Sequence, residues 1–238
     1  MPETKADARA KADARAQEGY HYSMGWYRFG IALWGTLFRR YCRLRVLGKE
    51  NIPKAGPVVV TANHLSMLDP FLVGYTLGTP HPVAFMGKQE LFRIPIAGYA
   101  IRQWGAFPVD RARKDASALR SALAVLKAGE VLGMFPEGTR STSGELQELR
   151  TGSLRLAIRT RSPLIPVGIA GTDKSLPRGG KFPKPAKIAI NYGPPMDLAA
   201  LYDHRPTEAE IEHCSEELRM TLERLHREAE AAWKPAPR

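Results

Sequence analysis

The chain has 238 residues, of which 44% are hydrophobic and 25% are charged, and its formal net charge is +11. This length suits one α/β domain with a full core, and the charged fraction excludes a protein built mainly of membrane-spanning helices. The positive charge favours an anionic partner such as nucleic acid, anionic lipid or a phosphorylated metabolite. The two cysteines, Cys42 and Cys214, lie far apart in the sequence and predict neither a disulfide framework nor a metal site.

The first segment, residues 1–18, is of low complexity. The hexapeptide KADARA occupies residues 5–10 and is repeated at residues 11–16. Its alanine-rich, charge-alternating composition offers no apolar face for a core, so we expect a disordered segment or a solvated helix.

The second segment, residues 19–49, combines aromatic and basic side chains. Residues 24–38 form an apolar run of about fifteen residues, whereas a membrane-spanning helix needs about 20. Arginines gather directly after this run, at positions 39, 40, 43 and 45. The pattern predicts an amphipathic interfacial helix that docks on an anionic membrane surface, as a peripheral or monotopic protein at the cytoplasmic face of the plasma membrane. The alternative is a helix that packs only on its own domain.

In the third segment, residues 50–238, strand and helix patterns alternate. Strands are predicted at 58–60, 83–86, 105–109, 131–135, 164–169 and 187–192, and helices around 71–73, at 95–104, 116–127 and 153–161, and after a capping box at Thr207. The alternation predicts a single α/β domain with a mixed, largely parallel central sheet flanked by helices. Polar loops follow several strand ends, where α/β sheets usually bind ligands.

A histidine and an aspartate five residues apart follow the first predicted strand. On a single helix, His64 and Asp69 would point about 140° apart, so they meet only if His64 lies in a loop and Asp69 in the first helical turn. Asp69 would then bind one imidazole nitrogen and leave the other as a general base toward a substrate hydroxyl. The alternative is structural, because Ser66 and Asp69 have the spacing of a capping box, and Asp69 before Pro70 suits a helix N-cap.

A second polar motif, residues 135–141 (FPEGTRS), follows the strand predicted at 131–135. It places Glu137, Gly138, Thr139 and Arg140 at the end of a buried strand. The arginine guanidinium suits bidentate phosphate recognition, and Glu137 would bind a hydroxyl or orient Arg140. An ordinary turn with a surface arginine explains any three of these residues but explains the whole motif poorly.

With these motifs in order, the chain resembles the glycerolipid acyltransferase family, whose best-known members make phosphatidic acid from lysophosphatidic acid. Four blocks carry the resemblance: residues 63–69 (NHLSMLD), 105–111 (GAFPVDR), 135–141 (FPEGTRS) and 164–167 (LIPV). Their order and intervals fit the family, and the resemblance covers residues 46–196.

The resemblance implies a role for each matching residue. His64 would be the general base and Asp69 its orienting partner. The acceptor's glycerol-phosphate portion would be bound by Arg111, Glu137, Gly138, Thr139 and Arg140. Arg150 stands where the family often has a lysine two residues before a glycine, so it keeps a cation there.

The resemblance further implies an O-acyltransferase without metal or cofactor. The acyl donor would be acyl-CoA or acyl carrier protein, and the acceptor a lysophospholipid, foremost 1-acyl-glycerol 3-phosphate. Glycerol 3-phosphate and other lysolipid or glycolipid acceptors stay open.

Two further functional classes compete with acyl transfer. A non-catalytic basic membrane- or nucleic-acid-binding protein would not depend on His64, but none of the common DNA- or RNA-binding motifs occurs, and no nucleic-acid partner is expected. A thioester hydrolase would use the same His64 and Asp69, but it would leave Arg111 and Arg140 unexplained.

Overall fold

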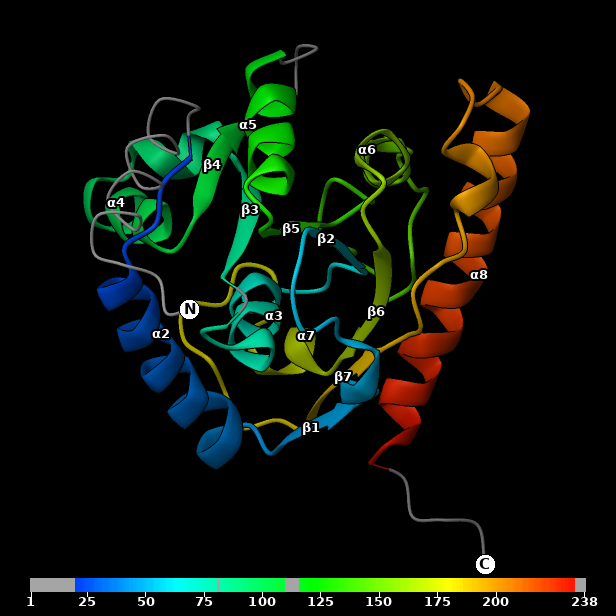
Figure 1. Ribbon diagram of the computed structural model, residues 1–238. Helices are drawn as coiled ribbons and strands as arrows, with labels where there is room; N and C mark the ends of the chain where they lie inside the picture. Colours follow the sequence, from blue (N-terminus) through cyan, green and yellow to red (C-terminus); the bar gives the residue numbers. More distant parts are fainter. Residues whose placement is uncertain (1–19, 81, 110–115, 234–238) are drawn as a thin grey trace, which may run out of the picture.

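The computed structural model of the protein describes residues 20–80, 82–109 and 116–233 (Figure 1). The low-complexity segment predicted at residues 1–18 lies outside these residues. The helices are α2 (Met24–Thr36), α3 (Asp69–Leu77), α4 (Pro95–Gln103), α5 (Ala116–Lys127), α6 (Gly152–Thr160), α7 (Thr172–Ser175) and α8 (Glu208–Ala231), with short turns η1 (Leu37–Tyr41), η2 (Lys49–Asn51), η3 (Gln89–Arg93) and η4 (Ala199–Leu201). The strands are β1 (Leu44–Leu47), β2 (Val58–Ala62), β3 (Val83–Lys88), β4 (Ala106–Val109), β5 (Val131–Met134), β6 (Leu164–Ala170) and β7 (Ile188–Tyr192).

The strands form one seven-stranded sheet in the order β1-β7-β6-β2-β5-β3-β4. Neighbouring strands are parallel except β6 and β7, which are antiparallel. The prediction of a mixed, largely parallel sheet is therefore confirmed. All five residues of β2 are buried between β5 and β6, as expected for a β-branched run in a central parallel strand. The loop that follows β2 thus begins at the middle of the sheet.

Helices cover both faces of the sheet, and each face has its own hydrophobic core. Successive side chains of a strand point to opposite faces, so Val59 packs in the core beneath α5, α6 and α8, whereas Val60 packs in the core beneath α2 and α3. Figure 1 shows α2 and α8 on opposite sides of the molecule. The capping box predicted for α8 is present, because Thr207 and Glu210 exchange their hydrogen bonds.

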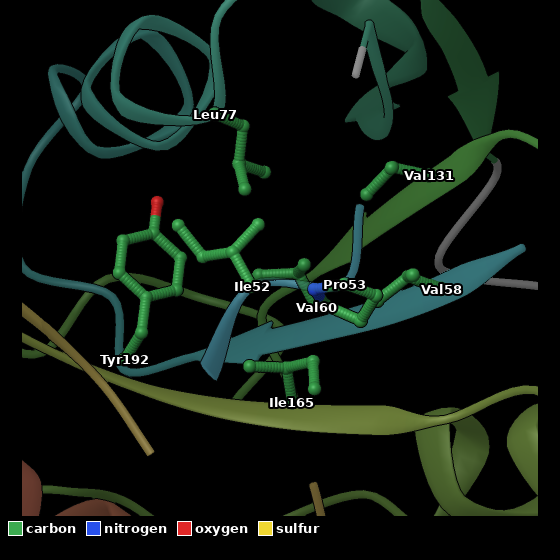
Figure 2. A pocket seen from close by; sticks show the side chains of 8 residues that line it. All are labelled: Ile52, Pro53, Val58, Val60, Leu77, Val131, Ile165 and Tyr192. Carbon is green, nitrogen blue, oxygen red and sulfur yellow. The ribbon is translucent and has the colours of Figure 1, made fainter. Parts of the chain in front are cut away.

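A small apolar cavity lies within the core between α3 and the sheet (Figure 2). It is lined by Ile52, Pro53, Val58, Val60, Leu77, Val131, Ile165 and Tyr192. Its volume is about 10 Å³, which is about the minimum for one water molecule, roughly 10–15 Å³, and it offers almost no polar partner. We therefore assign it to imperfect core packing.

The segment predicted to dock on a membrane is divided between the surface and the core. Tyr27 and Phe38, both expected at the membrane, are buried in the protein, and the Tyr27 ring centroid lies 4.9 Å from that of Trp104. Trp26, Phe29 and Leu33 remain exposed on α2. Within the part of the chain that the structure describes, no helix has the length and apolar character needed to cross a membrane.

Residues 44–47 of the same segment form an edge strand that the sequence did not predict. This strand, β1, pairs in parallel with β7, so the sheet begins before residue 50. Arg45, expected beside membrane lipid, instead lies over the Trp233 ring, 4.2 Å from its centroid, and binds the Ala232 carbonyl. Its charge therefore serves contacts within the protein at the end of α8.

Candidate functional site

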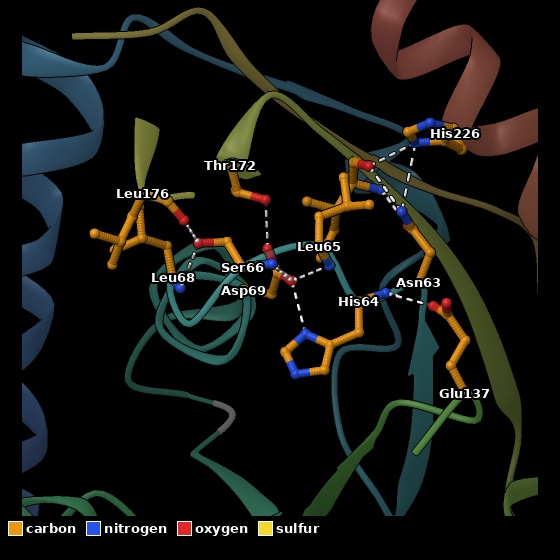
Figure 3. Close-up of polar contacts among 11 residues, drawn as sticks. Asn63, His64, Leu65, Ser66, Leu68, Asp69, Glu137, Thr172, Leu176 and His226 are labelled. Carbon is orange, nitrogen blue, oxygen red and sulfur yellow. Dashed lines mark hydrogen bonds and ion pairs between the residues drawn. The ribbon is translucent and has the colours of Figure 1, made fainter. Parts of the chain in front are cut away.

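The loop from β2 to α3 brings His64 and Asp69 into contact (Figure 3). His64 Nδ1 lies 2.8 Å from Asp69 Oδ2. Because His64 stands in the loop and Asp69 opens α3, the geometry is the one expected for a histidine paired with a carboxylate. The capping-box alternative is realised only in part: Asp69 accepts from the Ser66 N–H, but the Ser66 hydroxyl accepts from Leu68 N, and Leu68 is the N-cap of α3.

Asp69 is a fully buried carboxylate that accepts four hydrogen bonds. Its Oδ2 accepts from the backbone N–H groups of Leu65 and Ser66, each at 2.7 Å, and from His64. Its Oδ1 accepts from the Thr172 hydroxyl at 2.6 Å. A carboxylate has about four acceptor positions, so this set compensates for the loss of water around it.

The contact with Asp69 determines which nitrogen of His64 can accept a proton. A carboxylate only accepts hydrogen bonds, so Nδ1 carries the hydrogen and Nε2 keeps its lone pair. The ring stacks on Phe135, with centroids 4.0 Å apart, and the side chain retains 13% exposure. Nε2 points away from Asp69 in Figure 3. The arrangement presents an oriented basic nitrogen at the carboxyl end of the central strand.

Glu137, predicted to bind substrate, is buried, and each of its carboxylate oxygens accepts a backbone hydrogen bond. Its Oε1 accepts from the His64 backbone N–H at 2.7 Å, and its Oε2 accepts from the Gln147 backbone N–H at 3.1 Å. Burial raises the pKa of this carboxyl, and the two backbone N–H groups partly offset the rise. Ser141 N donates to the His64 carbonyl at 2.8 Å. The second motif therefore holds the loop that carries His64.

The remaining predicted residues lie at the end of β5. Gly138 has a φ of +69°, a conformation that favours glycine, and a Cβ there would lie 3.0 Å from Arg150 Nε. The structure therefore brings Gly138 and Arg150 together, with Arg140 and the exposed Thr139 on the same turn. Arg111 lies outside the described residues.

A cavity of about 160 Å³ opens beside this turn. Its wall is mostly apolar, with Met86, Met134 and Phe135 from the ends of β3 and β5, and Arg150 supplies a cation. Ser153, in the first turn of α6, also lines it, and its buried hydroxyl has no partner among the described residues. Phe135 both lines this cavity and stacks on the His64 ring, so one side chain links the cavity with the histidine.

Asn63 fixes the start of the loop from β2 to α3, because its side chain continues the hydrogen bonds of the sheet. Its amide donates to the Ile169 carbonyl at 3.0 Å and accepts from the Ile169 N–H at 2.7 Å, as a backbone peptide of β2 would do. His226 of α8 lies 2.7 Å from the same carbonyl. The residue before His64 is therefore held by hydrogen bonds to β6 and lies next to His226 of α8.

Sequence reasoning missed Thr172, His226 and the stacking of Phe135. Phe135 belongs to the second motif, and its position directly before the buried Pro-Glu turn was an available signal. Thr172 follows a glycine at the end of a buried strand, which is a ligand-binding position in α/β sheets. No local pattern on α8 distinguishes His226 from the other histidine of that helix, His213.

The chain is similar to known acyltransferases in sequence and in structure. Residues 43–170 match the Acyltransferase family. The 1-acyl-sn-glycerol-3-phosphate acyltransferase of Borreliella burgdorferi is 30% identical over 68% of this chain and 65% of that protein. The enzyme of the same description from Bacillus subtilis is 29% identical over 76% of this chain and 87% of that protein.

A solved structure gives the same result. The crystal structure of the 1-acyl-sn-glycerophosphate (LPA) acyltransferase PlsC from Thermotoga maritima has a TM-score of 0.71 and 31% identity, covering 89% of this chain and 80% of that one. The chain spans just under two thirds of the Borreliella protein and less than half of two plant chloroplast relatives. The family match covers more than half of the chain and contains His64, Asp69 and residues 137–140. The chain therefore belongs to the acyltransferase family.

Proposed function

We propose that this protein transfers a fatty acyl group from acyl-CoA or acyl carrier protein to the free hydroxyl of 1-acyl-glycerol 3-phosphate, giving phosphatidic acid. The observation that carries the proposal is the His64–Asp69 contact at 2.8 Å, which leaves Nε2 as a base. The stacking partner of His64, Phe135, also lines a cavity that has apolar walls and a cation. An amphiphile with a phosphate head and an acyl chain fits such a lining. The names of the curated relatives support the same acceptor.

The proposed mechanism is direct transfer with His64 as general base. Nε2 removes the proton of the acceptor hydroxyl as its oxygen attacks the thioester carbonyl carbon. The C–S bond of the resulting tetrahedral intermediate then breaks, and the thiolate takes the proton from the imidazolium. Asp69 stabilises the imidazolium while it exists and holds the ring in the productive tautomer. No nucleophilic side chain is required.

Arginines near the His64 loop could bind the phosphate group of the acceptor through their guanidinium groups. Arg140 and Arg150 have no ion-pair partner among the described residues, and we propose that they bind this phosphate together with Arg111. Gly138 lets the backbone of the turn approach a ligand closely, and Thr139 and the Ser153 hydroxyl are further hydrogen-bond donors nearby. Glu137 contributes by holding the loop rather than by touching the acceptor.

A panel of acceptors tests the proposed function. The purified full chain is given labelled acyl-CoA, and in parallel acyl carrier protein, with lysophosphatidic acid, glycerol 3-phosphate and two other lysophospholipids. We expect phosphatidic acid to form from lysophosphatidic acid at a rate at least tenfold above the other acceptors. Release of free fatty acid alone with every acceptor would instead identify a thioester hydrolase.

We further propose that exposed apolar residues of α2 and α4 dock on an anionic membrane surface. Trp26, Phe29 and Leu33 of α2 and Ile96 and Tyr99 of α4 form this apolar face, and all five are exposed. The Trp26 ring contacts both Phe29 and Tyr99, with centroids 5.8 and 6.1 Å apart, so the face is continuous across the two helices. Exposed arginines at positions 28, 39, 40 and 93 flank it.

Removing part of the apolar face should weaken membrane binding. Burial of one Phe or Ile side chain contributes about 1.5–3 kcal/mol, so Phe29→Ser combined with Ile96→Ser should reduce co-sedimentation with vesicles of anionic phospholipid by tenfold or more. Phe182→Ser is the matched control, because Phe182 is 80% exposed but lies outside the face. Equal binding of the double variant and the control would contradict the proposed face.

A further inference from the structure

We infer that Thr172 is a positioning residue for the base, because its hydroxyl holds Asp69 in the orientation that fixes His64. The inference rests on the proposed function, and it deepens it by assigning a residue that lies just beyond the family match at residues 43–170. Thr172 is fully buried, and its Oγ1 donates to Asp69 Oδ1 at 2.6 Å (Figure 3).

The two oxygens of Asp69 have different surroundings. Oδ2 accepts three hydrogen bonds, from His64, Leu65 and Ser66, all within the loop itself. Oδ1 accepts only from Thr172 among the described residues. Without that donor, a buried anionic oxygen would have no described partner, and the carboxylate would be free to rotate toward its other donors. Thr172 therefore links the loop to a separate part of the chain.

The position of Thr172 is set by a tight turn after β6. Gly171 has a φ of +84°, and a Cβ there would lie 2.1 Å from the Lys187 carbonyl oxygen, so this position requires glycine. The turn places Thr172 at the start of α7, within hydrogen-bond distance of Asp69. The residue that follows this short helix makes a second contact, because the Ser66 hydroxyl donates to the carbonyl of Leu176 at 2.7 Å. Two hydroxyl bonds thus hold the loop against α7.

Thr172→Val removes the hydroxyl and keeps the shape of the side chain. We expect it to lower kcat for acyl transfer roughly tenfold, with KM for the acceptor little changed, because Thr172 touches no substrate. Thr172→Ser restores a hydroxyl and should recover most of the rate. Thr160→Val is the matched control: Thr160 also donates to a partner, the Leu156 carbonyl, but at the far end of α6.

A double variant separates positioning from general destabilisation. If Thr172 acts through Asp69, then Thr172→Val should add almost no further loss in an Asp69→Asn background. A full tenfold loss there, or no rescue by Thr172→Ser, would overturn the inference.

A proton spectrum tests the contact independently of catalysis. The wild-type protein should show a downfield His Nδ1–H resonance that is absent in His64→Ala, displaced in Thr172→Val and unchanged in Thr160→Val. An undisplaced resonance in Thr172→Val would overturn the inference even if transfer is observed. Absence of transfer with every acceptor would instead reject the proposed function, while the resonance would still report on the role of Thr172.

Discussion

His64→Ala is expected to lower kcat for acyl transfer by about 10²–10⁴-fold, the usual range for loss of a positioned general base. The variant removes the basic nitrogen that Asp69 orients, on a ring that stacks against Phe135 in the wall of the cavity. Because the acceptor would still bind through the arginines, KM for the acceptor should change by much less. Initial rates with acyl-CoA and lysophosphatidic acid, measured over a range of both substrates, give the two constants.

His213→Ala is the matched control for this variant. His213 lies on α8 with a side chain that is 76% exposed, and its contact is with Glu217 one helical turn away. Its replacement should leave kcat within about twofold of the wild-type value. The His64 ring contributes a stacking contact with Phe135 and one of the four hydrogen bonds to Asp69, and the other three donors to Asp69 remain in the variant. Circular dichroism of both variants should therefore show the wild-type spectrum. Undiminished transfer by His64→Ala would refute the mechanism.

The parts of the fold that local patterns determine could be predicted from the sequence. Helix α5 was predicted at residues 116–127 from leucines at helical spacing and a terminating glycine, and the structure has the same bounds. Helix α8 was predicted from its capping box, which is present. The edge strand β1 was missed because it pairs with β7, more than 140 residues further along the chain. Its own four residues are also too few to show a clear alternation of apolar and polar side chains.

Some contacts of the candidate site could be predicted from the sequence, and others could not. The contact between His64 and Asp69 was one of the two arrangements that their spacing left open, and it requires the loop-to-helix geometry that the structure has. Thr172 could not be connected with Asp69, since 103 residues separate them in the sequence and the tight turn at Gly171 is visible only in three dimensions. The orientation of Glu137 was equally hidden, because a carboxylate in a motif gives no sign of which donors surround it.

Glu137→Gln is the second variant for which we expect a large effect, about 10–100-fold on kcat/KM. Glu137 accepts from the backbone N–H groups of His64 and Gln147, one at each oxygen. A glutamine has one carbonyl oxygen, so its NH₂ group must face one of these donors. A hydrogen bond to a charged group is worth about 1.5–3 kcal/mol, which corresponds to roughly 10–150-fold in rate if the lost bond displaces His64. Glu148→Gln, on an exposed neighbour, is the control and should be nearly silent.

The same substitution should change how stability depends on pH, and the direction follows from the raised pKa of Glu137. A carboxyl whose pKa is higher in the folded than in the unfolded protein, where it is about 4.3, binds its proton more tightly when folded. Its contribution to stability is therefore complete below the unfolded pKa and is lost as the pH rises through the folded pKa. Glutamine cannot titrate, so the Tm of the wild-type protein relative to Glu137→Gln should fall between acid and neutral pH. If the Tm of the wild-type protein instead rises relative to that of Glu137→Gln over this interval, the two backbone hydrogen bonds outweigh the cost of burying the charge. In that case Glu137→Gln would lose both activity and stability at neutral pH. We expect instead that the ionised Glu137 carboxylate positions His64 and lowers the stability of the wild-type protein at neutral pH.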